Sequence, residues 1–202
     1  MKTNAPTAEG LGDADQERLL RAAPGFRSPD GWFADMDPYG ITLLFLRVGV
    51  HPIVPARAVE HRLRIELRDD GLPRAVWDRP KKKGVSAWTS VELEPSDLEW
   101  ANPTIEWVRA NPRSTVTYRR FFHQLGEFAG CTHPCSPRVM RHTFATNLAR
   151  EVRDPEIIMR KLNCSLRTAA MYLKGASYDR DRAVAVNLFP VPRPKWEPRK
   201  SF

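Results

Sequence analysis

Cysteine is scarce in this chain, and long apolar runs are absent from it. Three cysteines in 202 residues cannot form the disulfide framework of a small secreted domain. No apolar run approaches the roughly 18 residues of a membrane-spanning helix, and residues 1–9 lack the apolar core of a secretory signal. These absences exclude a disulfide scaffold and predict an intracellular, cytoplasmic protein that does not span a membrane.

Acidic residues are also outnumbered by basic ones. Aspartate and glutamate total 24 against 32 lysines and arginines, so the net charge is +8. A basic chain favours an acidic partner, most often nucleic acid or a membrane surface. Hydrophobic residues make up 42% and charged residues 28%, as in ordinary folded domains. The 18 prolines, about twice the usual share, indicate short elements joined by rigid loops.

The chain divides into three segments and shows no internal repeat. Residues 1–30 are predicted to form a flexible, weakly structured arm, because Pro24 and Pro29 cut short a possible helix over residues 15–22. Residues 31–189 have a normal length for one compact domain. Residues 190–202 alternate proline with lysine and arginine, which is typical of a basic tail outside regular structure.

The sequence predicts a body that is mostly α with a small antiparallel β-sheet, an α+β class. Predicted helices span residues 39–48, 55–63, 96–110, 117–128, 136–152, 155–162, 165–174 and 179–188. Short runs rich in valine and tryptophan, at residues 72–77 and 87–93, predict two strands that flank a lysine-rich hairpin.

Capping patterns mark where several of these helices begin. Asp37 and Ser136 are each followed by proline, the pattern of an N-cap and first helical residue. Ser96 and Glu99 match a capping box. After Ser136, apolar side chains recur at every fourth position and predict one buried stripe: Met140, Phe144, Leu148 and Val152.

The segment from residue 136 to residue 148 carries the clearest functional pattern. It reads Ser-Pro-Arg-Val-Met-Arg-His-Thr-Phe-Ala-Thr-Asn-Leu, and Tyr172 follows 24 residues later. This resembles the catalytic domains of tyrosine recombinases, the phage-integrase family. Those domains carry His-x-x-Arg-His-Thr-Phe-Ala-Thr on one helix, then Leu-Gly-His, then a nucleophilic tyrosine. The resemblance extends over roughly residues 37–188.

The resemblance implies DNA strand cleavage and rejoining in site-specific recombination. A tyrosine oxygen attacks a phosphorus of double-stranded DNA and forms a 3′-phosphotyrosyl bond, without a metal, ATP or other cofactor. Two arginines and a histidine-type donor would stabilise the charge on the non-bridging oxygens. A lysine on a hairpin would protonate the leaving 5′ oxygen. The resemblance also implies a nucleoid location and possible homo-oligomers on DNA.

Three positions match the family's catalytic set. Tyr172 matches the nucleophile, Arg141 the second catalytic arginine, and Lys82 or its neighbour Lys81 the hairpin lysine. DNA contacts are expected from the lysine run and the helix that follows Ser136: Lys81, Lys82, Lys83, Arg138 and Arg141.

Three other catalytic positions are changed. His51 replaces the first arginine, Arg138 replaces the histidine of His-x-x-Arg, and Cys164 replaces the histidine of Leu-Gly-His. His51 and Arg138 are still hydrogen-bond donors, so an altered donor set around a phosphate is possible. The neighbouring His142 is interpreted as a buried structural residue.

Several alternatives remain open at this stage. The chain could be a catalytically decayed regulator that binds DNA without cutting it, a type IB topoisomerase-like nicking enzyme, or a protein-interaction module. The spacing from Cys164 to Tyr172 is one residue short of the commonest family spacing, so Tyr178 is an alternative nucleophile. Cys131, His133 and Cys135 could hold zinc, although a loop with reduced thiols is favoured over a metal site. The chain is also shorter than most relatives, and we expect no separate N-terminal helical domain.

Overall fold

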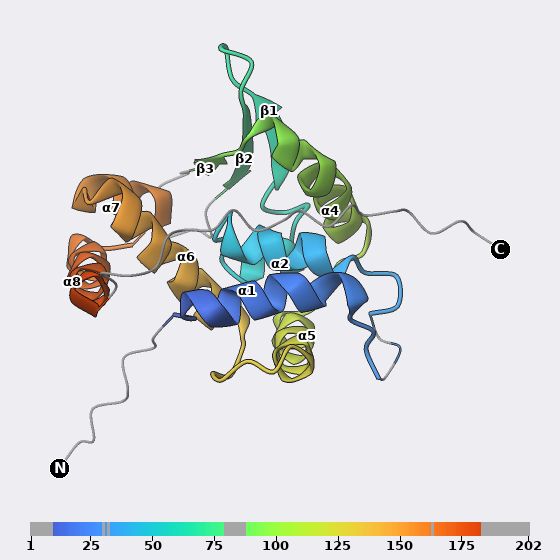
Figure 1. Ribbon diagram of the computed structural model, residues 1–202. Helices are drawn as coiled ribbons and strands as arrows, with labels where there is room; N and C mark the ends of the chain where they lie inside the picture. The colour runs from blue at the N-terminus through green and yellow to red at the C-terminus, as the bar shows by residue number, and fades with distance from the viewer. Residues whose placement is uncertain (1–9, 30, 32, 79–87, 163, 183–202) are drawn as a thin grey trace.

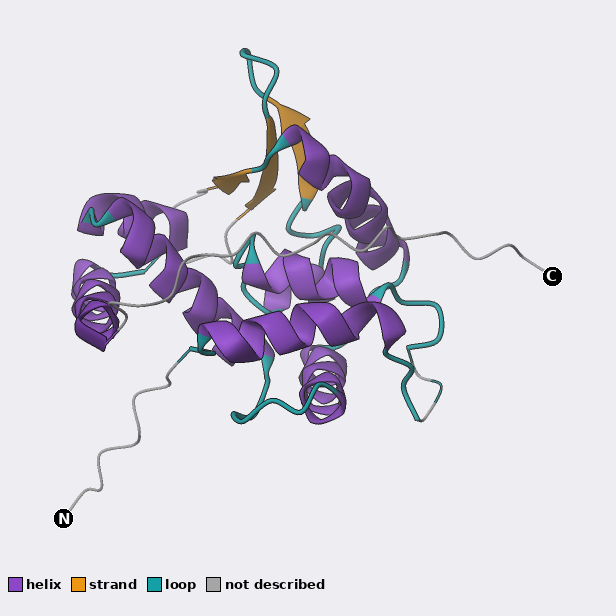
Figure 2. Ribbon diagram, in the orientation of Figure 1, coloured by secondary structure: helices purple, strands orange, loops and turns teal. Residues whose placement is uncertain are grey.

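The computed structural model describes residues 10–29, 31, 33–78, 88–162 and 164–182, except for the side chains of residues 175 and 177–182. The fold is mostly helical with one small sheet (Figures 1 and 2). The helices are α1 (Asp13–Ala22), α2 (Pro38–Leu46), α3 (Ile53–Ala56), α4 (Leu98–Ala110), α5 (Thr115–Phe128), α6 (Pro137–Val152), α7 (Pro155–Leu162) and α8 (Leu166–Arg182). Two 3₁₀ turns, η1 (Ala23–Gly25) and η2 (Pro95–Asp97), complete the helical elements of the described residues.

Helix α2 forms the centre of the core. Every residue of α2 except Tyr39 is buried, and the helix contacts α1, α4 and α6. The predicted N-cap is confirmed, because the Asp37 carboxylate accepts hydrogen bonds from the backbone N–H groups of Tyr39 and Gly40. At Gly40 an added Cβ would lie 1.9 Å from Thr104 Oγ1 of α4. The two helices therefore approach each other through glycine.

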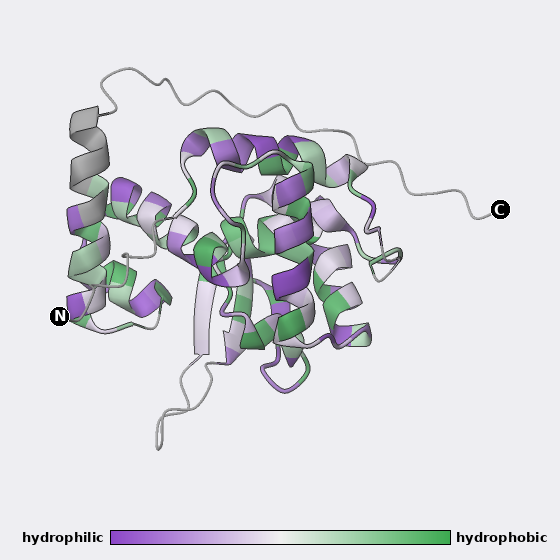
Figure 3. Cartoon of the chain, turned by 90° about the horizontal axis from the view of Figure 1, so that it is seen from below, coloured by the Kyte–Doolittle hydropathy of each residue, from purple (hydrophilic) through white to green (hydrophobic). Residues whose placement is uncertain are grey.

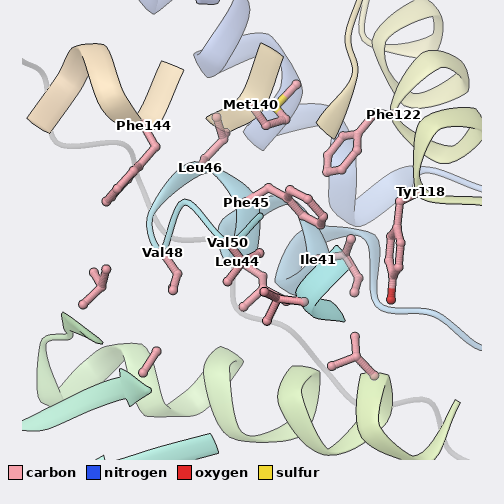
Figure 4. Close-up of a cluster of buried hydrophobic side chains, with 14 of the residues drawn as sticks. Ile41, Leu44, Phe45, Leu46, Val48, Val50, Tyr118, Phe122, Met140 and Phe144 are labelled. Carbon is pink, nitrogen blue, oxygen red and sulfur yellow. The ribbon is translucent and has the colours of Figure 1, made fainter. Parts of the chain in front are cut away.

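Aromatic side chains fill the space between α2 and α5 (Figure 4). The Phe45 ring of α2 packs edge-on against Phe122 of α5 with 4.9 Å between ring centroids, a favoured aromatic geometry. Phe121 and Leu125 of α5 are fully buried as well. Phe128 is 57% exposed because it lies at the end of the helix.

The sheet is antiparallel with the order β1–β2–β3. Its strands are β1 (Arg64–Leu67), β2 (Pro73–Asp78) and β3 (Trp88–Glu92). The predicted pairing of β2 with β3 is confirmed, with Val76 opposite Ser90. β1 was not expected from the sequence and pairs with the other edge of β2. The predicted hairpin tip, including Lys81, Lys82 and Lys83, lies outside the described residues.

Helices α6, α7 and α8 pack on one another at one end of the molecule (Figure 1). Ser136 caps α6 as predicted, because its hydroxyl accepts a hydrogen bond from Val139 N–H. Along the predicted stripe, Met140 and Phe144 are buried, whereas Leu148 and Val152 are half-buried. Helix α8 runs without a break to Arg182. The prediction of a separate helix that begins at residue 179 is therefore wrong.

Two other sequence predictions also need correction. The helix expected over residues 55–63 is the single turn α3, followed by turns. The capping box expected at Ser96 is formed two residues earlier, between Glu94 and Asp97 at the start of η2. α3 ends where Arg57 leaves the helical conformation, and Pro95 occupies the first turn of η2, so the N-cap is Glu94.

The N-terminal segment is part of the folded body over residues 10–29. Leu19 of α1 and the following Phe26 are buried in the core, and Leu11 N–H donates to Thr143 Oγ1 of α6 over 2.8 Å. This part of the chain differs from the flexible arm predicted for residues 1–30, because its apolar side chains find partners on α2, α5 and α6. Residues 1–9 lie outside the described part.

Several helices carry both polar and apolar residues along their ribbons (Figure 3). Among the described residues, no helix combines the length and the apolar character that crossing a membrane requires.

A buried carboxylate ties α1 to the loop that precedes α6. Asp15 accepts hydrogen bonds from the backbone N–H and hydroxyl of Thr132, at 3.0 and 2.7 Å, and from the backbone and ring of His133. Burial alone would raise the pKa of Asp15, but these four hydrogen bonds outweigh burial and hold its pKa well below the usual value. The ionised form of Asp15 therefore stabilises the contact between α1 and this loop.

We predict that Asp15→Asn lowers the free energy of unfolding by about 1–3 kcal/mol at pH 7, because an amide cannot accept all four hydrogen bonds. A carboxyl group with a lowered pKa stabilises the fold above its unfolded pKa of about 4 and loses this contribution as the pH falls through its folded value. The difference between wild type and variant should shrink below pH 4 in urea unfolding.

The exposed Asp69→Asn variant is the matched control for this experiment and should leave stability unchanged at both pH values. A wild-type and Asp15→Asn pair with equal stability at pH 7 would contradict the role given to the carboxylate.

Candidate active site

The candidate site lies where α6, α8 and the loop after α2 meet. Tyr172, the seventh residue of α8, is half-buried, and its hydroxyl oxygen lies 2.6 Å from Nδ1 of His142 on α6. The two rings are tilted by 46° with centroids 5.7 Å apart. The hydroxyl is therefore held by a hydrogen bond between two neighbouring helices.

Arg141 joins three segments around this hydroxyl. Its guanidinium donates to the carbonyl of Gly49, in the loop after α2, over 2.5 Å, and to the carbonyl of Leu162 at the end of α7. These bonds use two of the five N–H donors of an arginine. Tyr172 and Cys164 are close enough to interact electrostatically with its charge.

Gly49 is required at its position for two reasons. Its φ of +64° is a left-handed conformation that favours glycine. An added Cβ would also lie 2.0 Å from the Phe144 ring of α6. The loop therefore passes close against α6, and this approach brings the Gly49 carbonyl to Arg141.

His51 is placed on the Arg141 side of the site. Partial burial of its ring and then the positive charge of Arg141 lower the pKa of His51. Its Nδ1 accepts a 3.3 Å hydrogen bond from Ile53 N–H. Nδ1 is thus occupied, and in the neutral ring Nε2 carries the proton. Nε2 can then donate to a bound anion.

Arg138 lies on the first turn of α6 and is exposed to solvent. Its Nε donates to Nε2 of His142 over 3.3 Å. Burial, and then the charges of Arg138 and Arg141, lower the pKa of His142, so this imidazole is neutral at pH 7. The remaining guanidinium donors of Arg138 lie at the surface, where a phosphate could reach them.

The two other ionisable groups of the site carry no charge at neutral pH. Burial raises the pKa of Tyr172, and the nearby Arg141 only partly opposes this effect. Burial likewise raises the pKa of the Cys164 thiol, again opposed by Arg141. The site thus contains a protonated phenol, a thiol, neutral imidazoles and two guanidinium groups, a net positive set suited to a phosphate.

The structure brings together five of the six residues predicted as catalytic: Tyr172, Arg141, Arg138, His51 and Cys164. Lys82 lies outside the described residues, and so does the side chain of the alternative nucleophile Tyr178. The catalytic roles of all these residues stay predictions.

His142 is the functional candidate that the sequence interpretation missed, because it was taken as structural. Its spacing from Arg138 did contain a signal, since residues four apart share one face of a helix.

The possible zinc ligands Cys131, His133 and Cys135 are not grouped as a metal site. Nδ1 of His133 faces Asp15 rather than a pair of thiols, and burial strongly raises the pKa of Cys135, which opposes thiolate formation. Within the part of the chain that the structure describes, no three His, Cys, Asp or Glu side chains are grouped so that they could hold a metal ion.

Solved structures that this fold resembles include recombinases and an integrase. No family model matches the sequence, and no curated protein matches it. One of these solved structures is the XerH site-specific recombinase bound to a palindromic difH substrate, in a post-cleavage complex. The alignment covers 87% of this chain and 52% of the XerH chain, with a TM-score of 0.65 at 14% identity. The XerA recombinase matches 91% and 68% of the two chains, with a TM-score of 0.62 at 20% identity. The alignment with the Tn1549 transposon integrase, in complex with transposon right end DNA, covers 92% of this chain and 69% of the integrase chain. Its TM-score is 0.59 at 18% identity.

These likenesses define the fold class. The chain has the fold of tyrosine-recombinase catalytic domains, mostly helical with a small antiparallel sheet, and the predicted class is confirmed. It spans about half the length of the XerH chains that it matches. At identities of 20% or less, the likeness concerns the fold rather than the chemistry of the site.

We predict that Gly49→Ala lowers the free energy of unfolding by at least about 2 kcal/mol, because it combines left-handed strain with a clash against Phe144. Chemical denaturation followed by circular dichroism measures this change. Gly25→Ala is the matched control, because a Cβ at Gly25 would meet nothing within 4 Å. Equal stability of the two variants would show that the loop does not depend on this close approach.

Proposed function

We propose that this chain binds double-stranded DNA and cleaves and rejoins a strand through a 3′-phosphotyrosyl bond at Tyr172, in site-specific recombination. The observation that carries the proposal is the position of the Tyr172 hydroxyl, 2.6 Å from a neutral imidazole and within electrostatic reach of Arg141 and Arg138. A fold shared with recombinases that are bound to DNA supports it.

The proposed reaction is an in-line displacement at phosphorus. The Tyr172 oxygen attacks, and charge grows on the two non-bridging oxygens, which Arg138, Arg141 and His51 would stabilise. Lys82 would protonate the leaving 5′ oxygen, a role that the family resemblance implies. Because the phosphodiester energy is kept in the phosphotyrosyl bond, rejoining needs no energy source.

The changed positions favour one competing function, a DNA-binding regulator without cleavage activity. Losing one preorganised donor costs about 10²–10³ in rate, and two of Arg141's donors are already bound to carbonyl groups. However, when several donors act as a unit, the rate losses from removing each of them do not multiply. Arg138 and His51 also supply donors where the family has other residues, so we place cleavage first.

Cleavage predicts a covalent protein–DNA adduct. Wild-type protein incubated with nicked suicide DNA should give a band of lower mobility in denaturing electrophoresis. Tyr172→Phe should abolish this band while DNA affinity stays within a few fold, because the change removes the nucleophile but no guanidinium group. Tyr118→Phe, which removes a hydroxyl from the core, should leave the band intact.

Two outcomes would change the assignment. If wild-type protein binds the DNA and forms no adduct, the changes at His51, Arg138 and Cys164 have ended catalysis, and the regulator is the correct function. If the band persists in Tyr172→Phe and disappears in Tyr178→Phe, the nucleophile is Tyr178.

DNA binding should be driven by phosphate contacts. With a net charge of +8, affinity is expected to fall steeply as salt rises, because each neutralised phosphate releases counterions. Arg138→Ala should weaken binding and reduce the slope of log affinity against log salt by about one unit. Arg21→Ala on α1 removes an exposed arginine of equal charge and is the control. Affinity that does not change with salt would contradict the nucleic-acid partner.

A further inference from the structure

The hydrogen bonds of His142 determine which of its ring nitrogens carries the proton. Arginine only donates hydrogen bonds, so Nε2 of His142 accepts the bond from Arg138 and has no proton. The neutral ring therefore carries its proton on Nδ1. Nδ1–H then donates to the Tyr172 oxygen, 2.6 Å away. In this arrangement the imidazole cannot take the proton of Tyr172.

We propose that His142 is the catalytic base for Tyr172, an inference that rests on the proposed function. The hydrogen bond from Arg138, which we call the lock, keeps the ring in the tautomer that cannot take the proton. The lock is released when a DNA phosphate draws Arg138 away. In the motif that the chain resembles, a histidine precedes the arginine by three residues, and Arg138 stands at that position here. The ring that contacts the tyrosine comes instead from the position directly after Arg141.

Exposure of Arg138 makes the lock releasable. Its guanidinium is open to solvent on the first turn of α6, and a phosphate that binds it in a bidentate manner competes with a single 3.3 Å bond to a neutral nitrogen. Once Arg138 leaves, Nε2 takes a proton from water and Nδ1 returns one to water. This exchange changes no charge and leaves a lone pair on Nδ1 toward Tyr172.

The subsequent step balances in protons and bonds. The Tyr172 oxygen forms a bond to phosphorus, the bond from phosphorus to the 5′ oxygen breaks, and the phenol proton moves to Nδ1 to give an imidazolium. The leaving 5′ oxygen takes a proton from Lys82. In rejoining, the 5′ hydroxyl attacks, both protons return, and the tyrosine is released as a phenol.

Groups around His142 keep it neutral, which is the state in which one of its ring nitrogens can accept a proton. The charged and titratable groups that face it are Arg138 and Arg141 on its own helix and Tyr172 on α8. Burial and the two guanidinium groups lower its pKa. Cys164, which interacts with Tyr172 and Arg141, stays a neutral thiol.

The lock can be tested without any cleavage assay, by ¹⁵N NMR of the histidine rings in the full chain. Five histidines are present, and loss of one signal in His142→Gln assigns the ring. The free protein should show His142 protonated at Nδ1. Arg138→Ala, or addition of duplex DNA, should convert it to the Nε2–H form. An Nε2–H ring in the free protein, or no change on either treatment, would overturn the lock.

The role as base is tested by the rate of adduct formation. His142→Gln should lower this rate about 10²–10⁴-fold with DNA affinity within a few fold, whereas His123→Gln, an exposed change on α5, should not. The wild-type rate should level off above the pKa of His142. The variant rate should instead rise about tenfold per pH unit toward pH 10, since it depends on free phenolate.

A substrate with sulfur in place of the bridging 5′ oxygen separates the two proton transfers, because a thiolate leaves without protonation. His142→Gln should remain slow on it, while Lys82→Ala should recover. Equal rates for His142→Gln and wild type would overturn the inference and leave the proposed function standing. No adduct from wild type would overturn the proposed function, while the NMR result would still decide the lock.

Discussion

The arrangement of the site depends on the contacts of one guanidinium group. Arg141 holds the carbonyl of Gly49 and the carbonyl of Leu162, so it fixes the loop after α2 and the end of α7 against α6. The loop can approach only because Gly49 adopts a left-handed conformation under the Phe144 ring. His51 lies in this loop, and Tyr172 lies on α8, which follows α7, so both are positioned through the same side chain.

The electrostatics of the site follow from this arrangement. Two guanidinium groups and partial burial keep His142 neutral, and burial keeps Tyr172 protonated despite the nearby positive charge. Such a site attracts an anion but does not spontaneously form a phenolate. A proton acceptor is needed for attack, and His142 is the neighbour whose ring nitrogen contacts the hydroxyl. In the proposed mechanism, the charge that binds a phosphate also releases the base, because Arg138 serves both.

Features set by local chemistry were predictable from the sequence, and features set by distant contacts were not. The caps at Asp37 and Ser136 act within one turn, so the starts of α2 and α6 were correct. β1 was missed because its four residues, in which charged and apolar side chains alternate, gain their structure only by pairing with β2. The contact of His142 with Tyr172 was also missed, since it depends on how α6 and α8 cross. The motif around Arg141 indicates the chemistry that the resemblance implies. It does not show which residues take over the roles of the catalytic residues that are changed in this chain.

The central claim is that Tyr172 bonds covalently to DNA, and mass spectrometry of the adduct tests it most directly. Trypsin cleaves after Arg167, Lys174 and Arg180, so Tyr172 and Tyr178 fall in different peptides. After nuclease digestion of an adduct formed on nicked DNA, the account predicts a nucleotide mass on the peptide of residues 168–174. A nucleotide on the peptide of residues 175–180, or no modified peptide from protein that binds the same DNA, would contradict it.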